Sequence, residues 1–254
     1  MSESPLYVEI KKQVARIYFS RSSSDNGINT NLAEELREAI DCLEHNDEIR
    51  VLIITGSGSS FCSGTDFGSL KRNSIETFNL LKIADFVAGF SKPVIAVLNG
   101  NALDQGLEAA LACDFRLAAK GTNLGMQQVS SGLIPWDGGT QRLPRLVGES
   151  RAIEIILTGR LINVEEAYSI GLVDSIFLPD ELMDGAMSLA EIIASHGPIA
   201  ARYAKEAIKT GQEMSLDNGM RLEADLNVLL QSTSDRSEGI RSFLEKRKPE
   251  FRGK

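Results

Sequence analysis

Glu108 is the strongest candidate for acid or base chemistry in this sequence. It stands near the start of a predicted helix whose run LEAALAC is otherwise almost entirely apolar. A carboxylate at that place can simply stabilise the helix start through the helix dipole. If the carboxylate is partly buried, its pKa rises and it can pass a proton near neutral pH. The local sequence leaves both interpretations open.

Asp137 is a second candidate carboxylate. It lies in the segment IPWDGG, between the only tryptophan of the chain and two glycines. Because Asp before Gly is common in ordinary turns, the pattern favours a turn over catalysis. Asp137 remains a candidate for the site.

Two glycine-rich loops, at residues 55–67 and 99–110, each follow a predicted buried strand. Ligands of parallel α/β folds sit at the carboxyl ends of strands, and glycine lets a backbone N–H approach a ligand closely. One such loop alone is more often an ordinary turn. Neither loop is a GxGxxG fingerprint or a P-loop, which argues against nucleotide binding of those kinds.

The composition excludes several other classes of function. The formal net charge is −8, with 27 Lys and Arg against 35 Asp and Glu, which argues against non-specific binding of nucleic acid or anionic membranes. The cysteines Cys42, Cys62 and Cys113 form no CxxC pair, and the only histidines are His45 and His196. We therefore expect no disulfide framework, no metal site and a reducing, cytoplasmic location. The N-terminal residues lack a signal-peptide pattern, and no window approaches ~18 uninterrupted apolar residues, so we expect no membrane span.

Hydrophobic periodicity predicts the elements that position these residues. Short apolar runs alternating with amphipathic ones indicate a parallel α/β core, and the last third is typical of a helical module. The expected elements are an antiparallel hairpin at 6–10 and 14–19, a helix capped by Thr30 or Asn31, strands at 51–55, 93–100 and 115–118, a helix at about 77–89, and helices through most of the chain beyond Pro144.

Five ordered motifs resemble those of the enoyl-CoA hydratase/isomerase (crotonase) superfamily over nearly the whole chain. They are FCSGTDF, KPVIAVLNGNALDQGLEAALACDFRLAA, GLIPWDGGTQRLPRLVG, TGRLINVEEAYSIGLVD and EGIRSFLEKRKPEFRGK. The resemblance implies an α/β fold with a ββα spiral core over residues 1–195 and a C-terminal helical region over 196–254, which in this family supports trimers or dimers of trimers.

The resemblance also implies an acyl-CoA thioester substrate and no tightly bound cofactor, since coenzyme A belongs to the substrate. Two backbone N–H groups of the family form an oxyanion hole that stabilises the enolate, and often contribute the largest catalytic effect. By position these donors are Thr65 and Gln105. Both depart from the family, where the first position is commonly Ala and the second lies in Gly-Gly-Gly, here Asp104-Gln105-Gly106. A backbone N–H survives such replacements, but the added bulk should reshape the acyl pocket.

Coenzyme A contacts of the family come from three places. They correspond here to Asn26, Gly27 and Ile28, to Ser63 and Asp66, and to Lys92. Lys92, or the C-terminal Lys246 and Arg247, could supply cations for the phosphates.

The hydratases of this superfamily carry two glutamates beside the substrate. Glu108 matches the first, but Gln128 occupies the second position. Because Gln can hold a water but cannot transfer a proton, the ordinary two-carboxylate mechanism does not apply. Hydration with Glu108 alone, or with Asp137 as the acid, is one interpretation; double-bond isomerisation and 1,4-addition of water to a conjugated or cyclic dienoyl-CoA are others.

A non-catalytic acyl-CoA-binding member of the superfamily is the competing class of function. The loss of the second glutamate and of the triple glycine favours it. Glu108 argues for an enzyme, because a buried carboxylate without a function would be costly to keep. We therefore favour a hydratase that acts on an unusual acyl group.

Overall fold

The larger sheet carries the strands that lead into the candidate site. The computed structural model describes residues 4–69 and 75–254, and in that part of the chain this sheet has six strands in the order β1-β2-β3-β5-β7-β10. The β1–β2 pair is the predicted antiparallel hairpin, whereas β2, β3, β5, β7 and β10 run parallel. The strands are β1 (Leu6–Lys11), β2 (Val14–Phe19), β3 (Val51–Gly56), β5 (Val94–Leu98), β7 (Phe115–Ala119) and β10 (Ser175–Phe177).

A second, smaller sheet makes the fold a spiral. After β3, β5 and β7 the chain turns and adds a short strand to this sheet, so the β-turn-β unit occurs three times in succession. The turn after β5 is tight, because a Cβ on Gly100 would lie 1.8 Å from the carbonyl oxygen of Ser59. The strands are β4 (Ser60–Cys62), β6 (Asn101–Leu103), β8 (Asn123–Gly125) and β9 (Ile162–Asn163).

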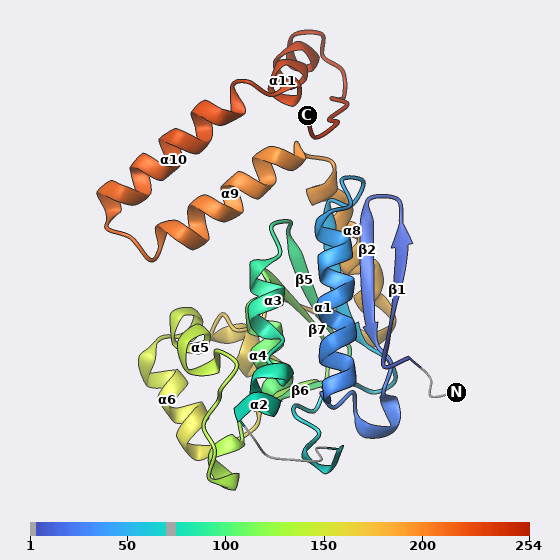
Figure 1. The fold of residues 1–254 in the computed structure, drawn as a ribbon, viewed down its shortest axis with the longest axis vertical. Coiled ribbons are helices and arrows are strands. Elements are labelled where there is room, and N and C mark those ends of the chain that lie inside the picture. The colour runs from blue at the N-terminus through green and yellow to red at the C-terminus, as the bar shows by residue number, and fades with distance from the viewer. Residues whose placement is uncertain (1–3, 70–74) are drawn as a thin grey trace.

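Helices cover both faces of the larger sheet (Figure 1). The N-cap of the predicted first helix is Asn29, just before the expected Thr30 or Asn31. Its side chain accepts a hydrogen bond from the Leu32 N–H. The helices before residue 195 in the described chain are α1 (Thr30–Glu44), α2 (Ile75–Leu81), α3 (Ala84–Gly89), α4 (Gln105–Ala112), α5 (Gly139–Val147), α6 (Glu149–Thr158), α7 (Val164–Ser169) and α8 (Leu182–Ala194), with 3-10 turns η1 (Ser22–Ser24), η2 (Phe67–Ser69), η3 (Gln128–Ser131) and η4 (Pro179–Glu181).

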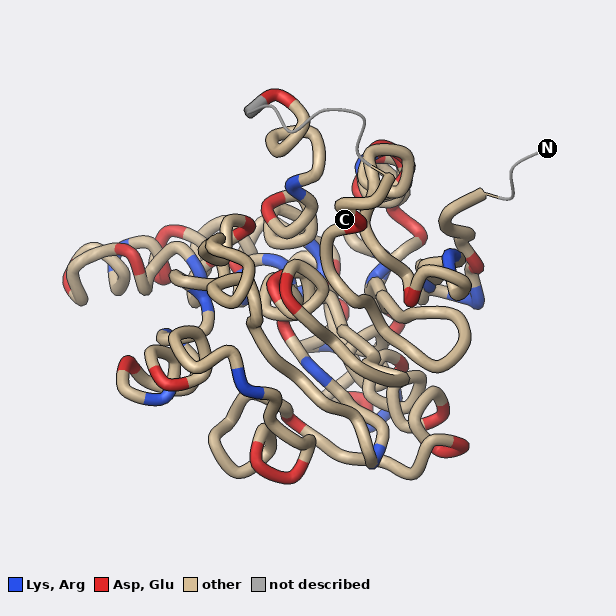
Figure 2. Tube along the Cα trace, turned by 90° about the horizontal axis from the view of Figure 1, so that it is seen from below, with Lys and Arg blue, Asp and Glu red and all other residues tan. Residues whose placement is uncertain are grey.

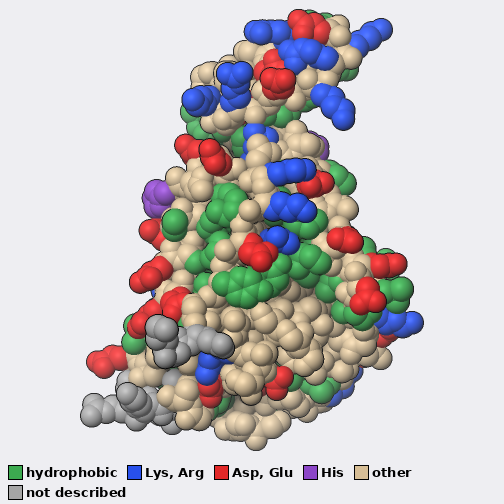
Figure 3. Space-filling view, turned by 90° about the vertical axis from the view of Figure 1, so that its right-hand side faces the viewer, with side chains coloured by type: hydrophobic (Ala, Val, Ile, Leu, Met, Phe, Trp, Pro, Cys, Tyr) green, Lys and Arg blue, Asp and Glu red, His purple; other side chains and the backbone are tan. Residues whose placement is uncertain are grey.

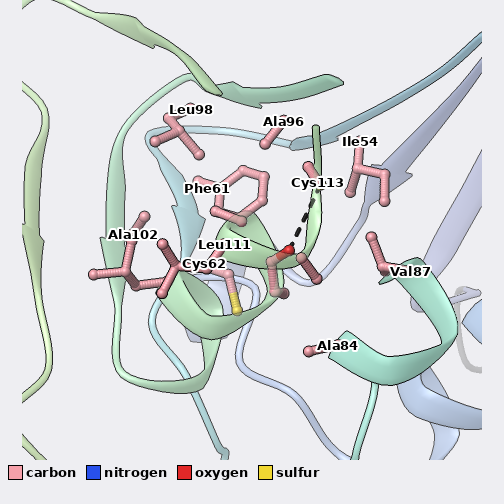
Figure 4. Close-up of a cluster of buried hydrophobic side chains, with 14 of the residues drawn as sticks. Ile54, Phe61, Cys62, Ala84, Val87, Ala96, Leu98, Ala102, Leu111 and Cys113 are labelled. Carbon is pink, nitrogen blue, oxygen red and sulfur yellow. Dashed lines mark hydrogen bonds between the residues drawn. The ribbon is translucent and has the colours of Figure 1, made fainter. Parts of the chain in front are cut away.

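Two apolar clusters hold the layers together. Leu52 and Ile54 of β3 point into the larger cluster, whereas Val51 and Ile53 point to the other face, against α8. This alternation explains why the whole strand is buried, as its apolar sequence predicts. Figure 4 shows part of the larger cluster, in which side chains of β3, β4, β5, α3 and α4 meet around Phe61.

The C-terminal helices extend beyond the sheet. In Figure 1, α9 and α10 lie side by side above the core, and α11 follows them. No helix within residues 4–69 and 75–254 is long and apolar enough to cross a membrane. The helices are α9 (Pro198–Gly211), α10 (Leu216–Leu230) and α11 (Ser234–Leu244).

Charged residues are distributed along the whole chain. Figure 2 shows Lys and Arg interspersed with Asp and Glu rather than collected in one region. On the face in Figure 3, hydrophobic side chains gather in a patch that a column of Lys and Arg side chains crosses. The surface is therefore mixed in charge despite the net charge of −8.

Two sequence predictions need correction. The helix expected at 77–89 is divided into α2 and α3, because the chain breaks at residues 82–83, where the N–H groups of Ile83 and Ala84 bond to Asp137 instead of to a preceding helical turn. The strands of the smaller sheet were not predicted. Three of them have three residues and one has two, too few for a periodic pattern to develop.

Candidate active site

Glu108 lies at the centre of a buried polar cluster. It stands in the first turn of α4 and is 0% exposed. Its Oε1 atom accepts hydrogen bonds from the backbone N–H groups of Asp137 (2.8 Å) and Gly139 (2.7 Å). Burial raises the pKa of Glu108 to about 7, the charge of Asp137 adds to this effect, and the backbone hydrogen bonds oppose it. A buried carboxyl group with this pKa can both accept and release a proton near neutral pH.

Gln128 lies beside the second oxygen of Glu108. Its Nε2 donates to Glu108 Oε2 at 3.1 Å, and the residue is 6% exposed. This contact directs the NH2 group of the amide toward Glu108. The other amide atom, Oε1, is an oxygen and can only accept a hydrogen bond. Within the described residues, Oε1 is buried and has no hydrogen-bond partner.

Asp137 supports this cluster through its backbone and its side chain. Its Oδ2 atom accepts from the N–H groups of Ile83 (2.9 Å) and Ala84 (3.1 Å), and from Gln105 Nε2 (2.9 Å). The residue is 2% exposed, and its Oδ1 atom is buried without a partner in the part of the chain that the structure describes. The turn predicted from Asp-Gly is present, and it also brings a second carboxylate beside Glu108.

The two expected oxyanion-hole donors belong to adjacent loops. Thr65 Oγ1 donates to Gln105 Oε1 at 2.7 Å, and a Cβ on Gly64 would lie 3.3 Å from the Gln105 nitrogen. Among residues 4–69 and 75–254, the backbone N–H groups of Thr65 and Gln105 have no hydrogen-bond acceptor. Both groups are therefore free to bind a developing oxyanion.

The Gln105 side chain links the parts of the site. It is 0% exposed and, besides its bonds to Thr65 and Asp137, donates to the carbonyl of Leu81 at 2.7 Å. Thr65 and Gln105, which both depart from the family pattern, thus form one hydrogen-bonded chain with Asp137. The larger side chain at position 105 therefore connects neighbouring loops through its hydrogen bonds.

Asp104 supplies the sharp turn before α4. Its φ of 48° and ψ of −123° lie in a region that favours glycine, the residue usual at this position in the family. The side chain offsets part of this strain, because its Oδ1 accepts from the Gln127 N–H at 2.5 Å. Asp104 therefore ties the loop before α4 to the segment that carries Gln128.

The loops predicted to hold coenzyme A are paired with each other. The Ile28 N–H donates to the Gly64 carbonyl at 2.7 Å, and the Asp66 N–H donates to the Ile28 carbonyl at 2.9 Å. The Asn26 side chain is buried and bonds the carbonyls of Ser57 and Ser60, so it shapes this wall from within.

Arg21, which the sequence analysis did not identify, clamps these loops. It donates to the Gly27 carbonyl and pairs with Asp66 Oδ2 at 2.8 Å. Burial of Asp66 raises its pKa, but the hydrogen bonds and charge of Arg21 outweigh burial and lower the pKa below its ordinary value. The sequence gave no signal of this pairing, because Arg21 and Asp66 are 45 residues apart.

Two of the three expected cations, Lys92 and Arg247, are already engaged in other contacts. Lys92 precedes β5, at the opposite end of the parallel strand from the site, and is 4% exposed. Its Nζ donates to the carbonyls of Leu43 and Asn46, at the end of α1. The structure therefore argues against Lys92 as a coenzyme A contact, because its ammonium group is buried and already bonded. Arg247 is also engaged, since it pairs with Glu238 and Glu245.

Sequence comparison shows which family this geometry belongs to. Residues 9–254 match the family model described as enoyl-CoA hydratase/isomerase. The chain belongs to the enoyl-CoA hydratase/isomerase family. The spiral of β-turn-β units described above is thus the fold of an enoyl-CoA hydratase/isomerase family member.

Relatives within this family cover essentially the full chain. A crotonyl-CoA hydratase of Syntrophomonas wolfei is 37% identical over 99% of both proteins. A 2,3-dehydroadipyl-CoA hydratase of Escherichia coli is 35% identical over 99% of this chain and 100% of its own. The crystal structure of an enoyl-CoA hydratase from Bacillus anthracis superposes with a TM-score of 0.95 at 38% identity, covering 98% of this chain and 100% of that one.

Proposed function

We propose that this enzyme adds water to the double bond of a 2-enoyl-CoA thioester, with Glu108 as the residue that transfers protons. The observation that carries the proposal is the environment of Glu108: it is fully buried, its pKa is raised to about 7, and its Oε2 atom faces an amide instead of a second carboxylate. The hydratases among the relatives support the same reaction class.

The proton steps follow from the two oxygens of Glu108. Oε1 is held by two backbone N–H groups, so Oε2 is the oxygen that reacts. One hydrogen of the water bonds to Glu108 Oε2 and the other to the unpartnered Gln128 Oε1. As the water oxygen bonds to C3 of the acyl group, Glu108 takes its proton and the C2=C3 electrons move toward the thioester carbonyl. Glu108 then delivers the proton to C2, which completes the addition of one water.

The enolate formed between these steps needs stabilisation on its oxygen. We assign this to the backbone N–H groups of Thr65 and Gln105. Each donor of such a hole typically lowers the activation barrier by about 3 kcal/mol. Because backbone groups of two adjacent loops provide them, the replacement of Ala and Gly by Thr and Gln leaves the donors intact.

Coenzyme A would lie along the paired loops at 26–28 and 63–66, where Gly27, Ile28, Ser63 and Asp66 are candidates for contact. Asn26 and Arg21 hold those loops in place.

We also propose a reducing, cytoplasmic location, with which the three unpaired cysteines agree.

We also propose a homotrimer or a dimer of trimers built through the C-terminal helices. Apolar side chains on α9, α10 and α11 are strongly exposed, including Ile208 (62%), Leu216 (79%) and Phe243 (81%). An exposed apolar surface of this kind is typical of an interface. Native mass spectrometry should give three or six copies, and a monomer would contradict this assembly.

The reaction is tested by mass spectrometry of enoyl-CoA and dienoyl-CoA thioesters incubated with the enzyme, in ordinary and in deuterated water. Hydration predicts a gain of one water and, in deuterated water, one carbon-bound deuterium at C2. Deuterium uptake without a gain of water would instead identify an isomerase. No change in any thioester would contradict the proposed activity.

A further inference from the structure

Among the described residues, one buried acceptor of the site still lacks a hydrogen-bond donor once the reacting water is bound. Three acceptor atoms of this buried cluster could take a hydrogen bond from a ligand: Glu108 Oε2, Gln128 Oε1 and Asp137 Oδ1. A water molecule has two O–H donors, and hydration directs these to Glu108 and Gln128. Asp137 Oδ1 is then a buried carboxylate oxygen facing no donor, which is costly in a protein interior.

The rest of the Asp137 carboxylate is fully engaged. Oδ2 has three donors, from Ile83, Ala84 and Gln105, so this oxygen fixes the side chain and caps the start of α3. The fixed orientation prevents Oδ1 from reaching these donors. Capping therefore explains one oxygen of Asp137 and leaves the other unexplained.

Asp137 is hydrogen-bonded to two other parts of the proposed site. Its backbone N–H bonds to Glu108, and its side chain bonds to Gln105, whose backbone N–H is one of the oxyanion donors. Asp137 is thus joined both to the residue that carries one oxyanion donor and to the residue that would act on the double bond. Glu108 and Asp137 are both buried, and they belong to one hydrogen-bonded cluster.

We propose that Asp137 Oδ1 is a recognition site for a hydrogen-bond donor on the substrate, and that the preferred substrate is a short enoyl-CoA with a hydroxyl group at C4 or C5. This inference rests on the proposed hydration, because the count of donors assumes one bound water. A hydroxyl gives Oδ1 the donor that a hydrocarbon chain cannot. A site built to bond a substrate hydroxyl discriminates strongly against analogues that lack it.

The test compares but-2-enoyl-CoA with its 4-hydroxy and 4-methoxy derivatives, and pent-2-enoyl-CoA with its 5-hydroxy and 5-methoxy derivatives. Dissociation constants are measured in the Glu108→Gln background, and kcat/KM in the otherwise unaltered enzyme. A hydroxyl derivative of one series should bind about 10- to 100-fold more tightly than its methoxy partner, which can accept but not donate a hydrogen bond.

Asp137→Asn provides the decisive variant. Its amide oxygen must take the place of Oδ2, because the N–H groups of Ile83 and Ala84 require an acceptor there, so its NH2 group replaces Oδ1. The preference for hydroxyl over methoxy should fall by about 10-fold or reverse. Asp85→Asn, which removes a largely exposed carboxylate paired with Arg142, should keep the preference.

Each failure has its own signature. Equal binding of hydroxyl and methoxy derivatives in both series, or a preference that persists in Asp137→Asn, overturns the recognition site even if every thioester gains water. If no thioester gains water but the hydroxyl preference is present and is lost in Asp137→Asn, hydration is wrong and the recognition site is supported.

Discussion

Glu108 and Asp114 are both carboxylates embedded in the fold, yet their surroundings differ. Asp114 pairs with two lysines, Lys205 and Lys209, at 2.8 Å each. It also accepts from the Val94 N–H at 2.8 Å. Among the described residues, Glu108 has only neutral hydrogen-bond donors around it, from two backbone N–H groups and Gln128.

The comparison shows how the partners of a buried carboxylate decide its role. Asp114 and its lysines connect the end of α4 and the start of β5 to α9, since Lys205 also donates to the carbonyls of Phe90 and Lys92. Burial lowers the pKa of Lys205, and the charge of Asp114 opposes that shift. Asp114 and its two lysines thus form a structural ion cluster, whereas Glu108, which pairs with no cation in the part of the chain that the structure describes, titrates near neutral pH.

The largest expected effect separates the two carboxylates by activity. Glu108→Gln should lower kcat by about 10²- to 10⁴-fold, the usual range for a general acid-base group, because the amide cannot transfer a proton. The rate is followed by loss of the enoyl-thioester absorbance. Circular dichroism should be unchanged, since the amide oxygen can still accept from Asp137 and Gly139. Full turnover by this variant would end the proposed role of Glu108.

Breaking the Asp114 group should instead reduce stability. Lys205→Met removes a buried partner and should lower the free energy of unfolding by about 3 kcal/mol, while kcat per folded molecule stays unchanged. Urea unfolding measures this loss. Lys209→Met is the matched control, because Lys209 is more exposed and its ion pair should contribute less than about 1 kcal/mol. Equal losses in both variants would contradict the structural distinction.

The raised pKa of Glu108 should also appear in the stability. In the unfolded chain this carboxyl ionises near its ordinary value of 4.5, but in the folded protein only near 7. Its contribution to stability is therefore complete below pH 4.5 and is lost as the pH rises to about 7, a change of about 3 kcal/mol. Wild type should lose this amount relative to Glu108→Gln between these pH values, as measured by urea unfolding. Parallel pH curves for the two proteins would show that Glu108 is not perturbed.

The smallest expected effect concerns the charge beside Glu108. Asp137→Asn removes a neighbouring negative charge that raises the pKa of Glu108, so the midpoint of the pH-rate profile should move to lower pH. The shift should be smaller than the one that burial causes, because burial is the main cause. A profile identical to wild type would place Asp137 outside the electrostatics of the reaction.

The sequence predicted the parts of this account that depend on local pattern. The hairpin, the buried strands and the loops around Thr65 and Gln105 could be read from apolar runs and glycines, and Glu108 from a lone carboxylate in an apolar helix. The contacts between Thr65 and Gln105, and between Gln105 and Asp137, join residues 40 and 32 positions apart. Such contacts exist only once the loops have folded together, so no local pattern reveals them.

Lys92 illustrates the opposite error. The family resemblance implied a coenzyme A contact at Lys92, but Lys92 precedes β5, whereas the glycine-rich loop lies at the far end of that strand. The direction of one strand decided its role. Asp137 was predicted as a turn residue, but it also caps the start of α3. It does so by accepting from the N–H groups of Ile83 and Ala84, which are more than 50 residues away in the sequence.

The most direct test of a single proton-transfer residue is the pH dependence of kcat/KM for a thioester that the enzyme hydrates. Because Glu108 must be ionised to accept the proton of water, and then returns that same proton to C2, we predict a single ascending limb with a midpoint near 7 and a plateau above it. A bell-shaped profile, with a second limb that falls at higher pH, would show that another group must be protonated and would contradict the one-carboxylate mechanism.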